Sequence, residues 1–173
     1  DAGTARTLTA QFTAGQVVKT YQAIVRRYLE PAGVIDHALR EEPDALADAH
    51  ADPNKAPQMA ITHFRRLATV ELPYPVSRYP TARYSLVELQ PKTGRKHQLR
   101  RHLKHIFHPI IGDTTHGDGR HNQFFARHFA NQRLLLAATA LQLRHPQSGE
   151  ALLIRAPLAA DFQRIVVALG WEA

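Results

Sequence analysis

One stretch of 17 residues, residues 92–108 (KTGRKHQLRRHLKHIFH), constrains this chain more than any other. It carries six Lys or Arg residues and four His residues, and it contains no Asp or Glu. After a turn at residues 93–94, the spacing of the apolar residues predicts a helix over residues 96–107. Leu99, Leu103 and Ile106 then form one apolar stripe, which can pack on a core.

Lys96, Arg100 and Lys104 form a second stripe on the same helix, and all three are cationic. Like charges four residues apart destabilise an isolated helix by about 0.2–0.5 kcal/mol per pair. We therefore expect a negatively charged group opposite this stripe. The sequence leaves three choices open: a phosphate backbone, a buried carboxylate, or both.

Composition narrows the class of protein. The chain has 173 residues, of which 44% are hydrophobic, so residues 1–173 suit one domain with a core of its own. Its net charge of +7 favours a nucleic-acid partner, because six of the 22 Lys and Arg residues lie in the one stretch. No cysteine is present, which excludes disulfides, thiolate catalysis and cysteine metal sites and is compatible with the cytoplasm. No apolar run approaches the twenty or so residues of a membrane helix, so we expect no membrane partner.

The chain alternates between helical and extended patterns, which predicts an α+β fold with a mixed, mostly antiparallel sheet and flanking helices. Helices are predicted over residues 3–12 and 161–169, and strands over residues 16–28, 59–71, 81–90, 133–144 and 151–155. Strands 59–71 and 81–90 should pair. Residues 109–122 are interpreted as a loop, as is the segment 41–52, which holds five acids.

The basic stretch and the segments near it contain motifs that also occur together in a known protein family. Residues 93–102 (TGRKHQLRRH) and 108–113 (HPIIGD) follow the patterns T-G-R-x-H-Q-hydrophobic-R-x-H and H-P-I-x-G-D, and residues 19–21 follow K-x-Y. Together these elements resemble the pseudouridine synthases of the RluA family. The resemblance covers almost the whole chain and is closest to a branch of that family that modifies tRNA.

The resemblance implies an enzyme that isomerises uridine to pseudouridine in RNA, in tRNA at uridine 65, as a cytoplasmic monomer. A ribosomal RNA uridine is the alternative within this class. An RNA-binding module without catalysis is the alternative from another class. The isomerisation breaks the N1–C1′ bond and rejoins the base through C5, so no cofactor or metal is expected.

Such chemistry requires an aspartate nucleophile and a pocket for a base that has left its stack. The resemblance implies that Arg100 pairs with this aspartate and keeps it ionised, because a buried carboxylate without a cation takes up a proton. It also implies that Tyr21 stacks on the uracil and helps to move the C5 proton. The alternatives are a surface or phosphate-binding role for Arg100 and a core position for Tyr21.

The same resemblance suggests residues that surround the RNA. Leu135 and Leu136 match the aliphatic wall of the base pocket, although one of the two must belong to the core. The family often has a histidine just after this run, where this chain has Ala137. Phosphate contacts, which bind RNA without reading its sequence, are expected from five cations: Lys19, Arg95, Lys96, Arg101 and Lys104.

The nucleophile itself has no counterpart. The family carries it in an H-R-L-D element roughly thirty residues before the tyrosine of K-x-Y, and no such element occurs in these 173 residues. Asp1 is about a dozen residues too close to Tyr21 to replace it. We therefore expect that the chain begins downstream of the nucleophile and is inactive alone. Arg100 would then be an unpaired charge near the core.

The remaining polar residues allow a different interpretation, a zinc hydrolase. His102 and His105 share a helix face, but no H-E-x-x-H motif and no ligand at a zinc-like spacing accompanies them. We expect no metal site. His97 and His102 are expected instead to bind the backbone near the helix ends, and Asp113 and Asp118 to bind amides of their own loop.

Overall fold

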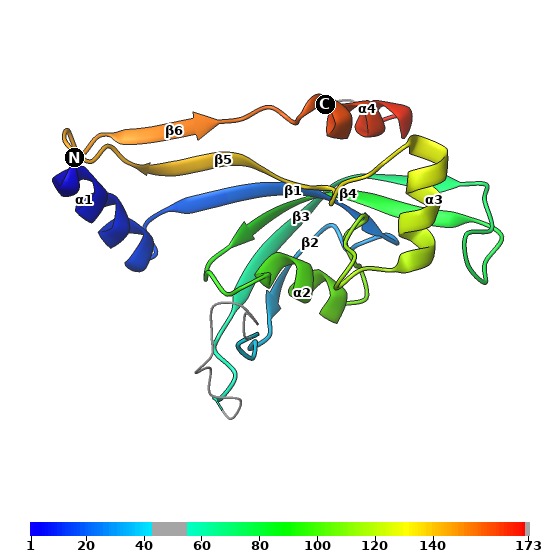
Figure 1. The fold of residues 1–173 in the computed structure, drawn as a ribbon, viewed down its shortest axis with the longest axis horizontal. Coiled ribbons are helices and arrows are strands. Elements are labelled where there is room, and N and C mark those ends of the chain that lie inside the picture. Colours follow the sequence, from blue (N-terminus) through cyan, green and yellow to red (C-terminus); the bar gives the residue numbers. More distant parts are fainter. Residues whose placement is uncertain (43–54, 172–173) are drawn as a thin grey trace.

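The structure is a computed structural model, and it describes residues 1–42 and 55–171. Its sheet has six strands in the order β2-β3-β4-β1-β5-β6, and each neighbouring pair is antiparallel. The predicted α+β class is confirmed (Figure 1). The described elements are α1 (Ala2–Thr13), β1 (Val18–Arg26), β2 (Ala32–Asp36), β3 (Ile61–Leu72), β4 (Ala82–Pro91), α2 (Gln98–His105), α3 (Gly119–Phe129), β5 (Leu136–Arg144), β6 (Ala151–Arg155) and α4 (Ala160–Ala168).

The core lies on both faces of the sheet, and β4 shows how the sequence divides it. Successive side chains of a strand point to opposite faces. Tyr84 and Leu86 therefore join one apolar cluster, to which α3 and α4 contribute. Val87 and Leu89 join the other cluster, to which α2 contributes. In Figure 1, α3 and α4 lie near one end of the sheet, and α2 lies apart from them.

Helix α2 is shorter than predicted, because both of its ends leave helical geometry. His97 precedes it with a left-handed backbone, at φ 53°, and Phe107 follows it at φ 65°. The apolar stripe is confirmed: Leu99 and Leu103 are buried, and Ile106 packs against the same cluster. This packing fixes which face of α2 is left for polar contacts.

Most of the predicted elements are present. The predicted strands 59–71 and 81–90 pair as β3 and β4, and the predicted strands 133–144 and 151–155 pair as β5 and β6. The predicted helices 3–12 and 161–169 are α1 and α4.

Two elements were missed. The interpretation of residues 109–122 as a loop is wrong from Gly119 onward, where α3 begins after Asp118. Phe125 and Phe129 were the available signal, since a spacing of four places both on one buried face. Strand β2 has five residues and buries only Ile35, which is too little for a periodic pattern.

Two further expectations concern loops and membranes. The acidic segment 41–52 lies outside the described residues except for Glu41 and Glu42. Among the helices of residues 1–42 and 55–171, none has the length and apolar character needed to cross a membrane.

Candidate active site

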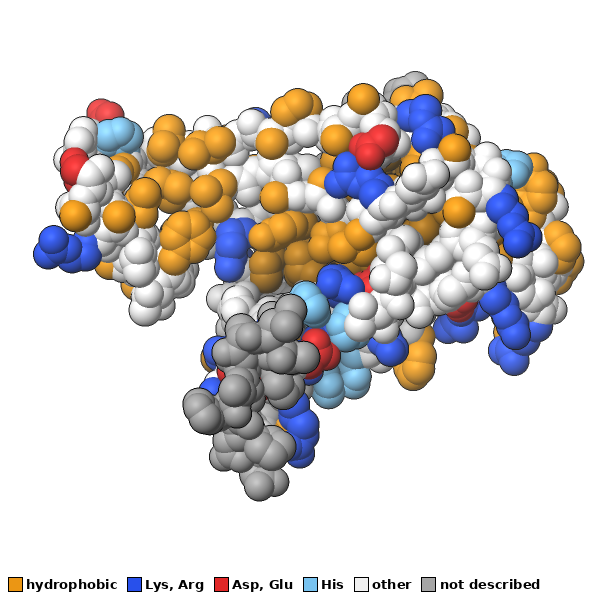
Figure 2. Space-filling view, in the orientation of Figure 1, with side chains coloured by type: hydrophobic (Ala, Val, Ile, Leu, Met, Phe, Trp, Pro, Cys, Tyr) orange, Lys and Arg blue, Asp and Glu red, His pale blue; other side chains and the backbone are white. Residues whose placement is uncertain are grey.

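A cleft of about 260 Å³ lies beside α2 and brings together residues that are far apart in the sequence. Its walls come from β1, from the turn before α2 with α2 itself, and from the start of β5. Five of the predicted site residues line it: Lys19, Tyr21, Arg95, Arg100 and Leu136. Figure 2 shows hydrophobic side chains in the middle of this face, beside Lys, Arg and His side chains.

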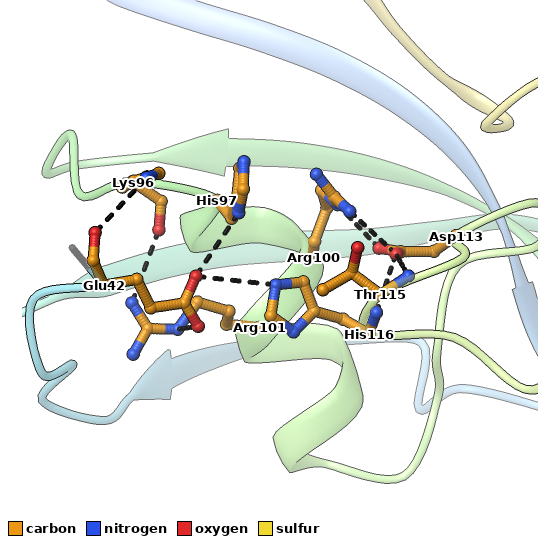
Figure 3. A network of polar contacts seen from close by, with 8 residues as sticks. All are labelled: Glu42, Lys96, His97, Arg100, Arg101, Asp113, Thr115 and His116. Atoms are coloured by element: carbon orange, nitrogen blue, oxygen red, sulfur yellow. Dashed lines mark hydrogen bonds and ion pairs between the residues drawn. The ribbon is translucent and has the colours of Figure 1, made fainter. Parts of the chain in front are cut away.

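Arg100 is paired, which corrects the expectation that it would be an isolated charge. Its Nε donates to Oδ2 of Asp113 at 2.7 Å, and its Nη2 donates to Oδ1 at 2.8 Å (Figure 3). The Asp113 side chain is only 1% exposed and that of Arg100 is 18% exposed. Bidentate pairs of this kind are strong and fix the plane of the guanidinium. Asp113 is thus a buried carboxylate opposite the cationic stripe, one of the three choices left open by the sequence.

Asp113 also binds the amides of its own loop, as predicted. Oδ1 accepts hydrogen bonds from the backbone N–H groups of Thr115 and His116, at 3.0 and 2.8 Å. Burial alone would raise the pKa of Asp113. The hydrogen bonds from Arg100 and from the two amides outweigh burial and lower this pKa to about 2. The carboxylate is therefore ionised at any physiological pH.

The loop that carries Asp113 is held by a close backbone approach. Gly112 has φ +84°, and a Cβ at this position would lie 2.0 Å from the carbonyl oxygen of Arg133. Only glycine fits there. Asn122, which the sequence analysis overlooked, accepts from the N–H of Gly112 at 2.7 Å and donates to the carbonyl of Asp113 at 2.8 Å. The position of Asp113, and with it that of Arg100, is therefore fixed from both sides.

Gln98 holds the turn before α2 and was also overlooked. It is buried, and its Oε1 accepts from Thr93 Oγ1 at 2.7 Å and from the N–H of Arg95 at 3.0 Å. Its Nε2 donates to the carbonyl of Ile61 and to Thr62 Oγ1, each at 3.0 Å. The side-chain amide thus ties the turn to β3. An uncharged polar residue beside Leu99 in a helix that is otherwise basic was the signal available.

Leu135 needs a correction as a pocket residue. It is fully buried in the cluster that contains Phe125 and Phe162 and does not line the cleft. Its neighbour Leu136 does line the cleft, because adjacent residues of an extended chain point to opposite sides.

The predicted phosphate-binding cations differ in how exposed they are and in the contacts that they already make within the protein. Arg101 needs a correction: its side chain is only 14% exposed, and its Nε lies 3.3 Å from Oε1 of Glu42. Lys96 Nζ donates to the backbone carbonyl of Glu42 at 3.2 Å, and Arg95 Nε donates to that of Met59 at 3.0 Å.

Lys104 lines a different hollow, of about 650 Å³. Arg26, Arg27 and Arg120 also line this hollow. The cationic surface of the protein therefore extends beyond the cleft.

The buried histidine His102 behaves as predicted. Its Nδ1 lies 2.9 Å from Thr62 Oγ1 and its Nε2 lies 2.9 Å from the carbonyl oxygen of His37. Burial lowers the pKa of His102, so the ring is neutral near pH 7. His97 departs from the prediction, because its Nδ1 faces the Glu42 carboxylate at 3.4 Å rather than the backbone.

Comparison with known proteins identifies the family to which these residues belong. Residues 1–105 match the family model described as RNA pseudouridylate synthase. The chain belongs to this family.

Several curated relatives are named tRNA pseudouridine synthase C. The one from Pectobacterium carotovorum subsp. carotovorum is 56% identical over 168 residues, which is 97% of this chain and 45% of the relative. The one from Yersinia pestis is 52% identical over 168 residues, or 97% of this chain and 65% of the relative. The chain thus spans between about half and two thirds of the length of these relatives.

Two human structures share the fold. RNA Pseudouridylate Synthase Domain Containing 4 is 27% identical, with a TM-score of 0.70 over 100% of this chain and 70% of the human chain. RNA Pseudouridylate Synthase Domain Containing 1 has a TM-score of 0.64 at 24% identity, covering 96% of this chain and 71% of that one.

Proposed function

We propose that this chain supplies the arginine, the aromatic side chain and the RNA-binding surface of an enzyme that isomerises uridine to pseudouridine in tRNA. The observation that carries the proposal is the cleft in which Arg100, fixed by Asp113, faces the same space as Tyr21 and Leu136. The T-G-R-x-H-Q and K-x-Y motifs converge on this cleft. The names of the relatives in the tRNA pseudouridine synthase C group favour tRNA, at uridine 65, as the substrate.

Arg100 would bind two carboxylates at the same time, on different edges of its guanidinium group. Asp113 accepts from the Nε–H and from one N–H of Nη2, which leaves the two N–H groups of Nη1 and the second N–H of Nη2 for the carboxylate of the family's nucleophile. The pair with Asp113 sets the plane of the guanidinium before the nucleophile arrives, and such preorganisation lowers the cost of the catalytic arrangement. Asp113 is thus a positioning residue, and Arg100 keeps the nucleophile ionised.

Tyr21 and Leu136 would form the wall against which the flipped uracil packs. An aromatic ring offers a stacking surface to any base, and its hydroxyl can accept or pass on the C5 proton after the new bond forms. An aliphatic neighbour excludes water from the same space. In this proposal residues 1–173 form the C-terminal bulk of a single catalytic domain, and the enzyme acts as a monomer in the cytoplasm, where tRNA is modified.

The role of Arg100 is tested in a longer version of the protein that carries an H-R-L-D element, with tritium release from 5-tritiated uridine in tRNA as the assay. Arg100→Met should abolish turnover while tRNA binding persists. The matched control, Arg155→Met, removes an exposed arginine of β6 and should keep both. Weakened binding with normal turnover at saturating tRNA would contradict the role. The same assay on ribosomal RNA distinguishes the alternative substrate.

The 173-residue chain without that element should bind tRNA and release no tritium, as the non-catalytic alternative also requires. Binding should weaken steeply with salt, since Lys96 and Lys104 are proposed to contact phosphates. Neutralising both to Gln should lower the slope of log K against log salt by between one and two. A control that neutralises the exposed Arg6 and Arg155 should leave the slope near the wild-type value. Equal slopes for the two double variants would remove Lys96 and Lys104 from the RNA surface.

A further inference from the structure

Three side chains with metal-binding atoms converge beside the cleft, on the side of α2 that bears Arg101. They are the carboxylate of Glu42, Nδ1 of His97 and Nε2 of His116, and their ligand atoms lie within 4.8 Å of one another. Oε2 of Glu42 is 3.4 Å from His97 Nδ1 and 3.7 Å from His116 Nε2. Figure 3 shows both histidines directed at this carboxylate.

His116 directs a buried ring nitrogen at this carboxylate. The residue is only 8% exposed, and within the described part of the chain its Nε2 atom is buried without a hydrogen-bond partner. The 3.7 Å separation from Glu42 is too long for a hydrogen bond. Buried polar atoms are nearly always satisfied, so this nitrogen needs an explanation.

The backbone of His97 gives a separate sign of a built site. A residue other than glycine rarely has positive φ, and such residues gather at functional sites. His97 has φ 53° at the position before α2, yet its side chain makes no capping hydrogen bond to the helix. The His97 carbonyl accepts from the N–H of Arg101 at 2.9 Å, so the backbone begins the helix while the side chain is left for other contacts. The ring contacts the Glu42 carboxylate, with Nδ1 3.4 Å from Oε2.

We propose that Glu42, His97 and His116 bind one divalent transition-metal ion, with Zn²⁺ as the best match. Two imidazole nitrogens and one carboxylate oxygen are a common protein ligand set for zinc, with water in the fourth position. Zinc–ligand distances of about 2.0–2.1 Å in a tetrahedron place neighbouring ligand atoms about 3.3 Å apart. The separations of 3.4 and 3.7 Å are close to this value, and the two imidazole nitrogens lie within 4.8 Å of each other, so small side-chain movements would complete the set.

Arg101 supports this assignment although it is a cation. Its Nε lies 3.3 Å from Oε1 of Glu42, whereas both histidines face Oε2. The guanidinium therefore orients the carboxylate through one oxygen and leaves the other for the ion, as partners of metal ligands commonly do.

The site would join three parts of the chain: the segment after β2, the start of α2, and the loop that carries Asp113. Because its ligands are at positions 42, 97 and 116, no local motif reveals it in the sequence. The proposed ion is a structural ion that links these three segments beside the cleft, and it takes no part in the proposed isomerisation.

The test uses chelator-treated 1–173 chain titrated with ZnCl₂ by calorimetry, and with CoCl₂ while the visible d–d absorption is recorded. One ion per chain and cobalt absorption typical of four-coordinate nitrogen and oxygen ligands are expected. His116→Ala, His97→Ala and Glu42→Gln should each weaken binding about tenfold or more, since even partners of metal ligands commonly cost that much. His63→Ala, which removes an exposed histidine of β3, should keep wild-type affinity.

Thermal unfolding separates lost binding from lost folding. With Zn²⁺, the Tm of the wild type and of the His63 variant should rise, because an ion that binds only the folded state stabilises it. The Tm of a folded Glu42→Gln variant should not respond. The absence of stoichiometric binding to the wild type, or equal affinities for the site variants and the His63 variant, would overturn the proposal.

Discussion

Replacing Asp113 by Asn tests the most buried charge pair of the described structure. The change removes the carboxylate that binds Arg100 and keeps the size of the side chain. Because the pKa of Asp113 is lowered from 3.8 to about 2, its ionised form stabilises the fold by about 2 kcal/mol at neutral pH. The remaining Arg100 charge, whose side chain is 18% exposed, adds a desolvation cost. We expect a total loss of about 2–3 kcal/mol.

The pH dependence gives this prediction a second signature. An acid with a lowered folded-state pKa contributes its full stability above its unfolded pKa and loses it as the pH falls toward the folded value. The difference between wild type and Asp113→Asn should therefore be constant from pH 7 to about pH 5. It should shrink between about pH 4 and pH 2.

Urea unfolding, followed by the fluorescence of the single and buried Trp171, measures both quantities. Asp36→Asn, at an exposed carboxyl of β2, is the control and should change stability by less than about 0.5 kcal/mol. The reasoning is refuted if Asp113→Asn matches this control at pH 7, or if its deficit stays the same at pH 2.

Two further predictions concern stability. Gly112→Ala should lower the free energy of unfolding by more than about 2 kcal/mol, because its Cβ meets the carbonyl of Arg133. Gly149→Ala, at φ +73° but in open space, is the control and should lower it by only about 1 kcal/mol. Equal losses in urea unfolding would contradict this reasoning. His121 is buried against the Tyr84 hydroxyl, and burial lowers the pKa of His121 to about 4. The neutral ring contributes stability above pH 6.5 that is lost as the pH falls toward 4. Between pH 6 and pH 5, His121→Leu should therefore take up about one proton fewer than the wild type on unfolding. An unchanged slope of unfolding free energy against pH would refute this.

The sequence predicted what depends on local pattern. The stripe of Leu99, Leu103 and Ile106 predicted the buried face of α2, and the extended patterns at residues 59–71 and 81–90 predicted the pairing of β3 with β4. The placement of Lys19 and Tyr21 on one face follows from the alternation of side chains along a predicted strand, and both residues line the cleft.

The sequence could not predict contacts that depend on where separate segments meet. Arg100 and Asp113 are thirteen residues apart and join through a loop whose course depends on the approach of Gly112 to Arg133. Glu42 comes from a segment interpreted only as an acidic loop, and it pairs with Arg101, which had been expected to bind phosphate. Long-range electrostatic partners of this kind leave no periodicity in the sequence.

The strand order also has a consequence for the synthesis of the chain. Strand β1 is the first of the six described strands along the chain but lies in the interior of the sheet, between β4 and β5. One of its partners is about 70 residues away along the chain and the other about 120 residues away, as the pairs Tyr21–Leu89 and Lys19–Leu141 show. On a ribosome that adds about 5–20 residues per second, β1 is therefore synthesised several seconds before β4 and longer before β5, the two strands that pair with it. Distant pairing of this kind slows folding, which makes β1 the segment for which we expect the greatest need of chaperone protection.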